Sequence, residues 1–315
     1  MFTMILALLD PKIRTMLDKT ATDPSWHTVP VKQARAMFLA NALAGAGDIP
    51  APVSSEDISI PSPDVTIPAR LYRPAAAPQP CPTLLFFHGG GFVLGSLDSH
   101  DAMCRYICAK SGVQVLAVDY RLAPEHKFPA ALDDALAASR WLISNCQTIG
   151  ADPKRLAIGG DSAGANLATN VCRLLRYQDL FPFRHQSLIY PMIDLRMAMP
   201  SYQMFGEGYR LTRDIARWFI GSYMHKSDDA TDPKLSPLLA DDVSLLPPAF
   251  ILTAGFDPLR DEGQAYVKAL RNAGVTCEHA CFTDMIHGFC IMPKTIPRAY
   301  NALNRVSGEL IAALA

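Results

Sequence analysis

The sequence carries no excess of charge of either sign. It has 29 lysine and arginine residues against 30 aspartate and glutamate residues, and only 19% of its residues are charged. A strongly basic surface is what draws nucleic acid or an anionic membrane to a protein. The composition therefore predicts neither nucleic acid nor a charged membrane surface as a partner.

Long apolar runs are also missing. The first nine residues are largely apolar, but the run ends at Asp10, well short of the ~20 residues that a membrane-spanning helix needs. The same segment lacks a basic leader and a small-residue cleavage site, so we interpret it as an amphipathic helix, with a signal peptide as the alternative. We expect no membrane insertion. The sequence shows no internal repeat and no low-complexity tract.

The eight cysteines lack the spacing of a metal site. Two pairs have i,i+4 spacing, Cys104/Cys108 and Cys277/Cys281, but neither has a second pair of ligands at a fixed short distance. Cys277, His279 and Cys281 alternate along a predicted strand, so we expect them on one face of a sheet. We predict no metal and no cofactor. Free thiols without a signal peptide indicate a reducing compartment, the cytoplasm.

What the chain does contain is enough apolar sequence for a large core, with 315 residues of which 50% are hydrophobic. Short apolar runs alternate with amphipathic stretches of about a dozen residues, which is typical of βαβ units and predicts an α/β fold with a mostly parallel sheet. The predicted strands are 57–60, 65–72, 84–87, 115–118, 156–158, 188–190, 250–252 and 276–282. The predicted helices are 5–17, 31–43, 101–109, 129–143, 165–177, 212–224, 261–273 and 298–314.

One region departs from this alternation. Between Asp194 and Pro248 the sequence predicts loops and one helix but no strand. We expect an insertion at 195–235 and the helical segment 1–50 to form a cap, with 51–194 and 236–315 forming the α/β domain. The cap would cover the carboxyl edge of the sheet, where open α/β sheets bind their ligands.

A G-x-S-x-G pattern follows the predicted strand 156–158. Gly160 and Gly164 flank Ser162, and an amphipathic helix begins at once. At such a strand-to-helix corner the serine backbone is strained, and a side chain at either glycine would collide with the neighbouring strand or helix. The corner directs the hydroxyl outward at the positive end of the helix. We interpret Ser162 as a nucleophile; a solvated serine in a glycine-rich turn is the alternative.

A serine nucleophile also needs backbone donors for an oxyanion, and residues 88–91 are the candidate. His88 and the glycines Gly89, Gly90 and Gly91 follow a predicted strand directly. Three glycines let backbone N–H groups approach a substrate oxygen, and the N–H of Ala163 would join them. A flexible turn is the alternative interpretation.

The base and the orienting acid have candidates farther along the chain. His287 follows the last predicted strand with a glycine beside it, and Asp257 follows the strand 250–252. Asp257 precedes a proline at a helix start, so a helix N-cap is its alternative role. The chain order Ser162, Asp257, His287 is the nucleophile–acid–base order of α/β-hydrolases.

Five motifs taken together resemble the bacterial hormone-sensitive-lipase family of esterases, in its GDSAG branch. They are residues 88–91, 119–126, 160–164, 257–263 and 286–289. The resemblance implies an α/β-hydrolase fold with an eight-stranded sheet and a helical cap. It also implies hydrolysis of short- to medium-chain acyl esters without a cofactor. Ala165 departs from the family pattern, which often has glycine there.

The resemblance assigns roles residue by residue. Ser162 would be the nucleophile, His287 the base and Asp257 the orienting acid. The N–H groups of Gly90, Gly91 and Ala163 would form the oxyanion hole, with Gly89 shaping the loop, and residues 120–125 would tie a loop beneath the site.

Candidate substrate-contacting residues lie on the helix predicted at 212–224. Ile215, Ala216 and Phe219 share one face of it at helical spacing, and Phe92 follows the glycine loop. An apolar stripe on a helix is as readily explained as core packing. These four residues are the predicted lining of the substrate pocket.

The sequence thus predicts a serine carboxylesterase acting on a small-molecule ester. An amidase or deacetylase using the same triad is the alternative, since both reactions pass through one oxyanion. A non-catalytic receptor on this scaffold is a further alternative, although the presence of His287 argues against it. An interfacial lipase would need a larger lid. We also expect that the strand 276–282, as an exposed edge, could pair two copies into a homodimer.

Overall fold

The computed structural model describes residues 9–176 and 181–315. Part of the helix predicted at 5–17, and Tyr177 at the end of the helix predicted at 165–177, lie outside these residues. Within them the chain forms one eight-stranded sheet in the order β1-β2-β4-β3-β5-β6-β7-β8. The strands are β1 (Val53–Pro61), β2 (Thr66–Pro74), β3 (Cys81–Phe87), β4 (Gln114–Val118), β5 (Ala151–Asp161), β6 (Phe183–Ile189), β7 (Ala249–Phe256) and β8 (Cys277–Ile286).

The sheet is mostly parallel, as the alternation of strands and helices predicts. Strand β2 pairs antiparallel with β1 and β4, and the pairs from β4 through β3, β5, β6 and β7 to β8 are parallel. The continuous apolar strands β3, β4 and β7 are buried along their whole length, because helices cover both faces of the sheet. All eight predicted strands are present, and the mostly parallel sheet is confirmed.

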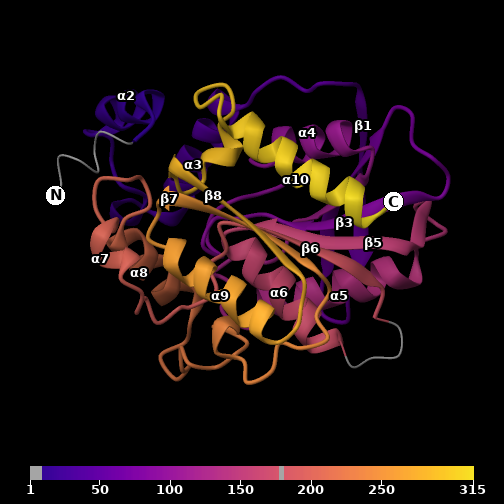
Figure 1. Ribbon diagram of the computed structural model, residues 1–315. Helices are drawn as coiled ribbons and strands as arrows, with labels where there is room; N and C mark the ends of the chain where they lie inside the picture. Colours follow the sequence, from indigo (N-terminus) through magenta and orange to yellow (C-terminus); the bar gives the residue numbers. More distant parts are fainter. Residues whose placement is uncertain (1–8, 177–180) are drawn as a thin grey trace.

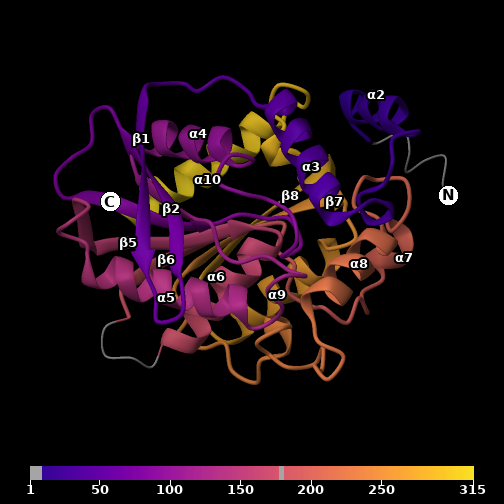
Figure 2. The same cartoon turned by 180° about the vertical axis from the view of Figure 1, so that it is seen from behind.

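Helices form a layer on each face of the sheet (Figures 1 and 2). One layer contains α4 (Asp101–Ser111) and α10 (Ala299–Ala313), and the other contains α5 (Ala130–Ser144), α6 (Ala163–Leu175) and α9 (Arg260–Asn272). Helix α6 lies at the centre of its layer and most of its residues are buried. Its alanines and glycine permit this close approach because they place little bulk between the helix and the sheet.

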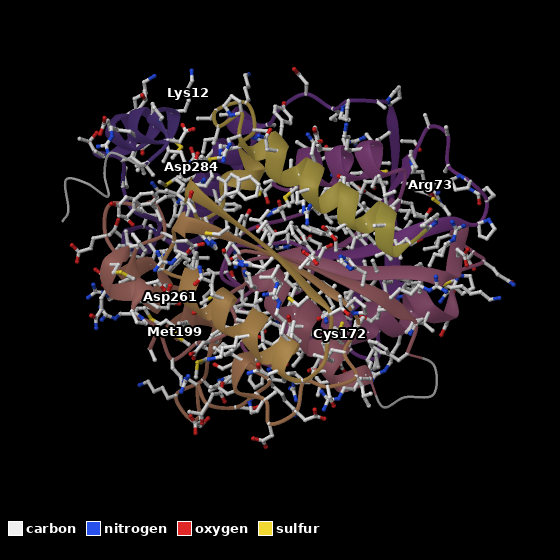
Figure 3. All side chains as sticks on the ribbon, viewed as in Figure 1. Lys12, Arg73, Cys172, Met199, Asp261 and Asp284 are labelled. Atoms are coloured by element: carbon white, nitrogen blue, oxygen red, sulfur yellow. The ribbon has the colours of Figure 1, made fainter. Side chains whose placement is uncertain are left out.

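The remaining helices gather at one end of the sheet (Figures 1 and 2). They are α2 (Pro11–Thr20), the 3₁₀ turn η1 (Trp26–Thr28), α3 (Val31–Gly45), α7 (Ser201–Met204) and α8 (Arg213–Tyr223). The N–H of Asp10 donates to the carbonyl of Asp284 at 3.1 Å, which ties α2 to β8; Figure 3 shows Asp284 on the same side of the molecule as Lys12 of α2. Two further 3₁₀ turns, η2 (Pro237–Leu239) and η3 (Phe289–Ile291), complete the elements.

A buried carboxyl group holds the segment that follows β6. Glu262 of α9 is fully buried, and its Oε1 accepts the N–H of Ile193 at 2.8 Å. Burial raises the pKa of Glu262 well above its usual range. The contact fixes the chain just before residues 195–235, where it leaves the sheet to form α7 and α8.

All eight cysteines are free, and seven of them are buried. None of the helices formed by residues 9–176 and 181–315 combines the length and the hydropathy of a membrane-spanning segment. His279 lies on β8 between Cys277 and Cys281, as the sequence predicts. It contacts Thr253 on the neighbouring strand β7, with Nε2 of the histidine 3.0 Å from the threonine Oγ1.

Candidate active site

Ser162 occupies a strained corner between β5 and α6. Its φ of 54° and ψ of −118° lie in a region that non-glycine residues rarely adopt. The surrounding backbone fixes this conformation: the N–H of Ser162 donates to Ile189 at 2.9 Å, and its carbonyl accepts the N–H of Met192 at 3.1 Å. A Cβ atom at Gly160 or Gly164 would overlap the carbonyl oxygen of Phe87 on β3. The two flanking glycines are therefore required by close packing.

Three side chains from three strand ends meet at this corner. The Nε2 atom of His287 lies 2.9 Å from the Oγ atom of Ser162, and Nδ1 lies 2.8 Å from Oδ2 of Asp257. Because the carboxylate only accepts, Nδ1 carries a hydrogen and donates to it, which leaves the lone pair of Nε2 to accept the serine hydroxyl hydrogen. This is the arrangement in which a serine hydroxyl can lose its proton while it attacks an electrophile.

Asp257 is fully buried, and each of its carboxylate oxygens has a separate partner. While Oδ2 contacts His287, Oδ1 accepts the N–H of Leu259 at 2.8 Å and shapes the turn before α9. The N-cap position of α9 is Leu259, so Asp257 does not cap the helix in the way that its place before Pro258 suggests. The turn instead fixes the carboxylate so that its second oxygen faces the imidazole.

The glycine loop after β3 presents backbone N–H groups beside Ser162. Gly90 and Gly91 have φ values of 124° and 62°, which favour glycine strongly, and both line the same pocket as Ser162. Within the described residues no backbone acceptor is found for the N–H groups of Gly90, Gly91 and Ala163. The N–H of Gly89 differs, because it donates to Oδ1 of Asp161 at 2.7 Å and so is not available to a substrate.

Asp161 is a buried carboxylate directly behind this loop. Its Oδ1 also lies 3.2 Å from Nε2 of His100. Burial acts to raise the pKa of Asp161, but the His100 ring, the Gly89 N–H and the His88 ring together hold it below its ordinary value. The carboxylate is therefore ionised at neutral pH and anchors the loop through Gly89.

Comparison with known proteins identifies the family of the chain. A family profile described as the alpha/beta hydrolase fold matches residues 84–291. This chain belongs to the α/β-hydrolase family. The resemblance to the hormone-sensitive-lipase branch that the five motifs predict is confirmed.

Several similar proteins are named as ester hydrolases. The chain is 48% identical over 243 residues to the carboxylic ester hydrolase LipN of Mycobacterium tuberculosis, a match that covers 75% of this chain and 64% of LipN. It is 41% identical over 284 residues to an ethyl acetate hydrolase of Pseudomonas putida, covering 88% of each chain. Among solved structures, an α/β-hydrolase enzyme from the metagenome of Lake Arreo in Spain has a TM-score of 0.93 and 39% identity, covering 97% of this chain and 98% of that one.

The pocket of this α/β-hydrolase at Ser162 is narrow, with a volume of about 40 Å³. Besides Ser162, His287 and the glycine loop, it is lined by aromatic and aliphatic side chains, most of them from residues 1–50 and 195–235. They are Trp26, Phe38, Leu211, Phe219 and Ile291. A Cβ atom at Gly91 would overlap the ring of Phe219, so α8 lies directly against the loop. A wider groove of about 610 Å³ shares Trp26 and Arg210 with the pocket and is bordered by α2, α3 and α8.

The four predicted lining residues have different positions. Phe219 lines the pocket and Ile215 lines the groove. Ala216 is buried and lines neither. Phe92 is also buried away from both, because its ring stacks on Tyr223 of α8 with centroids 3.9 Å apart. Phe92 thus packs the glycine loop against α8 instead of facing the pocket.

Sequence reasoning missed several residues that line the pocket. Trp26 and Phe38 come from the N-terminal helical segment, Arg210 precedes α8, and Asp161 lies inside the serine motif. The predicted cap indicated that residues 1–50 and 195–235 supply side chains to the pocket, but not which side chains face it. The proximity of a tryptophan to Ser162, 136 positions along the chain, has no signal in the sequence.

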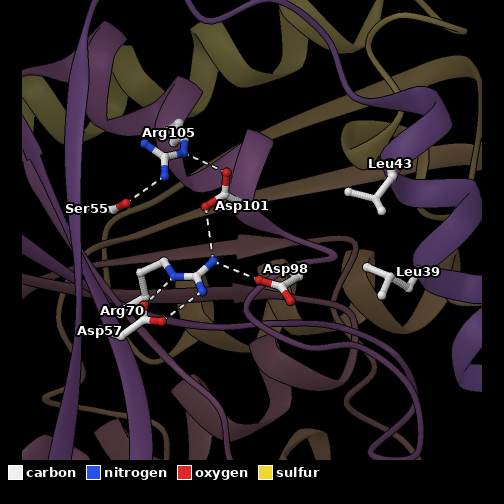
Figure 4. A pocket seen from close by; sticks show the side chains of 8 residues that line it. All are labelled: Leu39, Leu43, Ser55, Asp57, Arg70, Asp98, Asp101 and Arg105. Atoms are coloured by element: carbon white, nitrogen blue, oxygen red, sulfur yellow. Dashed lines mark hydrogen bonds and ion pairs between the residues drawn. The ribbon is translucent and has the colours of Figure 1, made fainter.

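A second large cavity, also about 610 Å³, lies between α3, α4 and the antiparallel edge of the sheet (Figure 4). Its charged side chains are paired with one another: Arg70 contacts Asp57, Asp98 and Asp101, and Arg105 contacts Asp101. No histidine, cysteine or hydroxyl nucleophile activated by a base lines it. We interpret it as a surface ion-pair network that fixes β2 to α4.

Proposed function

We propose that this protein is a carboxylesterase that hydrolyses short- to medium-chain acyl esters, with Ser162 as nucleophile, His287 as base and Asp257 as orienting acid. The observation that carries the proposal is the chain of contacts from Asp257 through His287 to Ser162, at 2.8 and 2.9 Å. The naming of relatives as carboxylic ester and ethyl acetate hydrolases supports the same conclusion.

The reaction follows from these positions. His287 accepts the Ser162 proton through Nε2 as the hydroxyl oxygen attacks the ester carbonyl. The N–H groups of Gly90, Gly91 and Ala163 then stabilise the tetrahedral oxyanion, for which removal of one such donor typically costs about 10²–10³ in rate. His287 returns the proton to the departing alkoxide, and water hydrolyses the acyl-enzyme by the same route. Asp257 stabilises the imidazolium and fixes its tautomer.

The helical segments supply the substrate pocket. We propose that residues 1–50 and 195–235 act as a cap over a catalytic domain formed by 51–194 and 236–315. The small pocket of about 40 Å³ favours a short acyl group, and the adjoining groove leaves room for a larger substituent. No step in this mechanism requires a metal or a cofactor.

The proposal also includes the cellular compartment and the oligomeric state. The free and mostly buried cysteines fit a reducing cytoplasm. Strand β8 is an outer strand of the sheet, so pairing of two copies along it would give a homodimer. Light scattering of the purified chain tests this, because a monomeric mass at micromolar concentration contradicts the dimer.

The experiment that tests the activity is a rate series over p-nitrophenyl esters of increasing acyl length. We expect a maximum at short to medium chains, and we expect Ser162→Ala to abolish the burst of p-nitrophenol. A parallel series compares each ester with the matched anilide. Faster turnover of the anilide would reassign the protein as an amidase, and absence of acylation in the wild type would leave a binding protein.

A further inference from the structure

Arg210 is a cation in the substrate pocket that the proposed mechanism does not use. It precedes α8 and lines both the pocket at Ser162 and the wider groove, so it lies at the boundary between them. Asp161, Ser162 and His287 line the same pocket, but within the described residues none of them forms a hydrogen bond or an ion pair with its guanidinium. Its φ of 66° is uncommon for a residue with a side chain, and the fold holds it there.

Within residues 9–176 and 181–315, the contacts of Arg210 leave most of its donors without a strong acceptor. Nη1 lies 2.6 Å from the thioether sulfur of Met292, and the guanidinium lies over the ring of Trp26 at 5.5 Å from its centroid. Sulfur is a weak acceptor, and a guanidinium carries five N–H donors. Among the described residues no carboxylate forms an ion pair with Arg210, whereas Arg35 and Arg121 each contact one at 2.6 and 2.8 Å.

The charge persists at neutral pH although its surroundings oppose it. Burial lowers the pKa of Arg210 to about 10, so the side chain remains protonated near pH 7. The fold has thus already removed water from part of this cation without pairing it with a carboxylate, since Asp161, which lines the same pocket, forms no ion pair with it. A ligand that brings the opposite charge gains more from such a site than from a solvated arginine, because the desolvation has already occurred.

We propose that Arg210 is a specificity-determining residue that binds a carboxylate carried by the ester substrate. This inference rests on the proposed esterase function and specifies its substrate class. Arginine presents a planar fork of N–H donors that matches the two oxygens of a carboxylate. Because Arg210 and Ser162 line one narrow pocket, the carboxylate lies a short way from the scissile carbonyl. Such substrates are half-esters of short dicarboxylic acids or acyl esters of short hydroxy acids.

The test compares anionic esters with their neutral counterparts. Monoethyl succinate against diethyl succinate places the carboxylate on the acyl side, and 2-acetoxypropanoate against its methyl ester places it on the alcohol side. Hydrolysis is followed in a pH-stat for the wild type, Arg210→Met and Arg210→Lys. Arg217→Met is the matched control, because Arg217 is an exposed arginine of α8 paired with Asp214.

We expect kcat/KM for the anionic ester, divided by that for its neutral counterpart, to fall by about 10- to 100-fold in Arg210→Met on one of the two sides. Arg210→Lys should recover part of the ratio, because lysine keeps the charge but loses the fork. The ratio should stay unchanged in Arg217→Met. A ratio that is the same in wild type and Arg210→Met on both sides, while the neutral esters are hydrolysed, overturns the inference and leaves the esterase function standing.

A binding measurement separates the two proposals if hydrolysis fails. Calorimetry of monoethyl succinate and 2-acetoxypropanoate with Ser162→Ala reports the carboxylate site without turnover. Binding of either anion that is lost in the double variant with Arg210→Met supports the site, even where no ester is hydrolysed and the esterase function falls. Equal binding in both variants, with a matching melting temperature, contradicts the carboxylate site.

Discussion

Removal of the Asp161 carboxylate should slow acylation more than it weakens substrate binding. Its Oδ1 accepts the N–H of Gly89 at 2.7 Å, and the same oxygen faces Nε2 of His100 at 3.2 Å. In Asp161→Ala both groups lose this partner inside the protein. Gly89 directly precedes Gly90 and Gly91, so the change reaches the proposed oxyanion donors without altering the contacts of Ser162 and His287.

The magnitude follows from these two contacts. A buried N–H left without an acceptor costs about 1–3 kcal/mol, and a hydrogen bond to a charged group contributes about 1.5–3 kcal/mol. We therefore expect the free energy of unfolding to fall by about 2–3 kcal/mol. If the loosened loop misplaces one donor, kcat falls by about 10²-fold, the lower end of the range for losing an oxyanion contact. KM should change little, because the change acts on donors that hold the oxyanion, which forms only after the ester is bound.

Urea unfolding and steady-state kinetics on a p-nitrophenyl ester measure both effects. Asp161→Asn is the control, since the amide oxygen still accepts the Gly89 N–H while the charge beside His100 is lost. We expect Asn to retain more kcat than Ala. A wild-type kcat in Asp161→Ala, or equal losses of kcat in Ala and Asn, would refute the idea that the carboxylate acts by holding Gly89.

Two further predictions concern packing and pH. Gly164→Ala should destabilise the fold by about 1–3 kcal/mol and abolish most activity, because the added Cβ would overlap Phe87. Gly308→Ala in α10 is the control, since nothing lies within 4 Å of a Cβ added there. It should leave activity unchanged and raise the melting temperature. His185 is buried and its pKa is lowered to about 4, so the unfolded chain binds a proton more readily below pH 6.5. Stability should fall by up to about 3 kcal/mol from pH 6.5 to 4, and His185→Gln should flatten this slope in urea titrations at several pH values.

The fold could be predicted because buried strands are recognisable as apolar runs in the sequence. The buried centres of β3, β4 and β7 appear in the sequence as unbroken hydrophobic segments, and both ends of most helices fall within a few residues of their predicted positions. Strand β5 is longer than predicted. It begins at Ala151, because residues 152–155, three of which are charged, extend the strand beyond the buried core, where apolar patterning gives no signal.

Some features of the candidate site could likewise be predicted from the sequence, and others could not. Ser162, Asp257 and His287 follow strands at places that topology dictates, so their meeting could be predicted, although their catalytic roles stay a prediction. The position of Phe92 could not be predicted, since its stacking on Tyr223 depends on how α8 packs. The place of Arg210 in the pocket could not be predicted for the same reason. A side chain on a long connection between strands has no periodicity that tells which way it faces.

The site is built from two halves, which the hydrogen bond between Ser162 and His287 connects. In the first, neighbouring strand ends brace one another: the Tyr120 hydroxyl after β4 donates to the His88 carbonyl after β3 at 2.7 Å, and Asp161 at the end of β5 accepts from Gly89. In the second, β7 and β8 carry Asp257 and His287. The contact from His287 to Ser162 at 2.9 Å joins them. Damage to the first half should therefore lower kcat by misplacing the proposed oxyanion donors, whereas damage to the second should lower it by removing the base that takes the Ser162 proton.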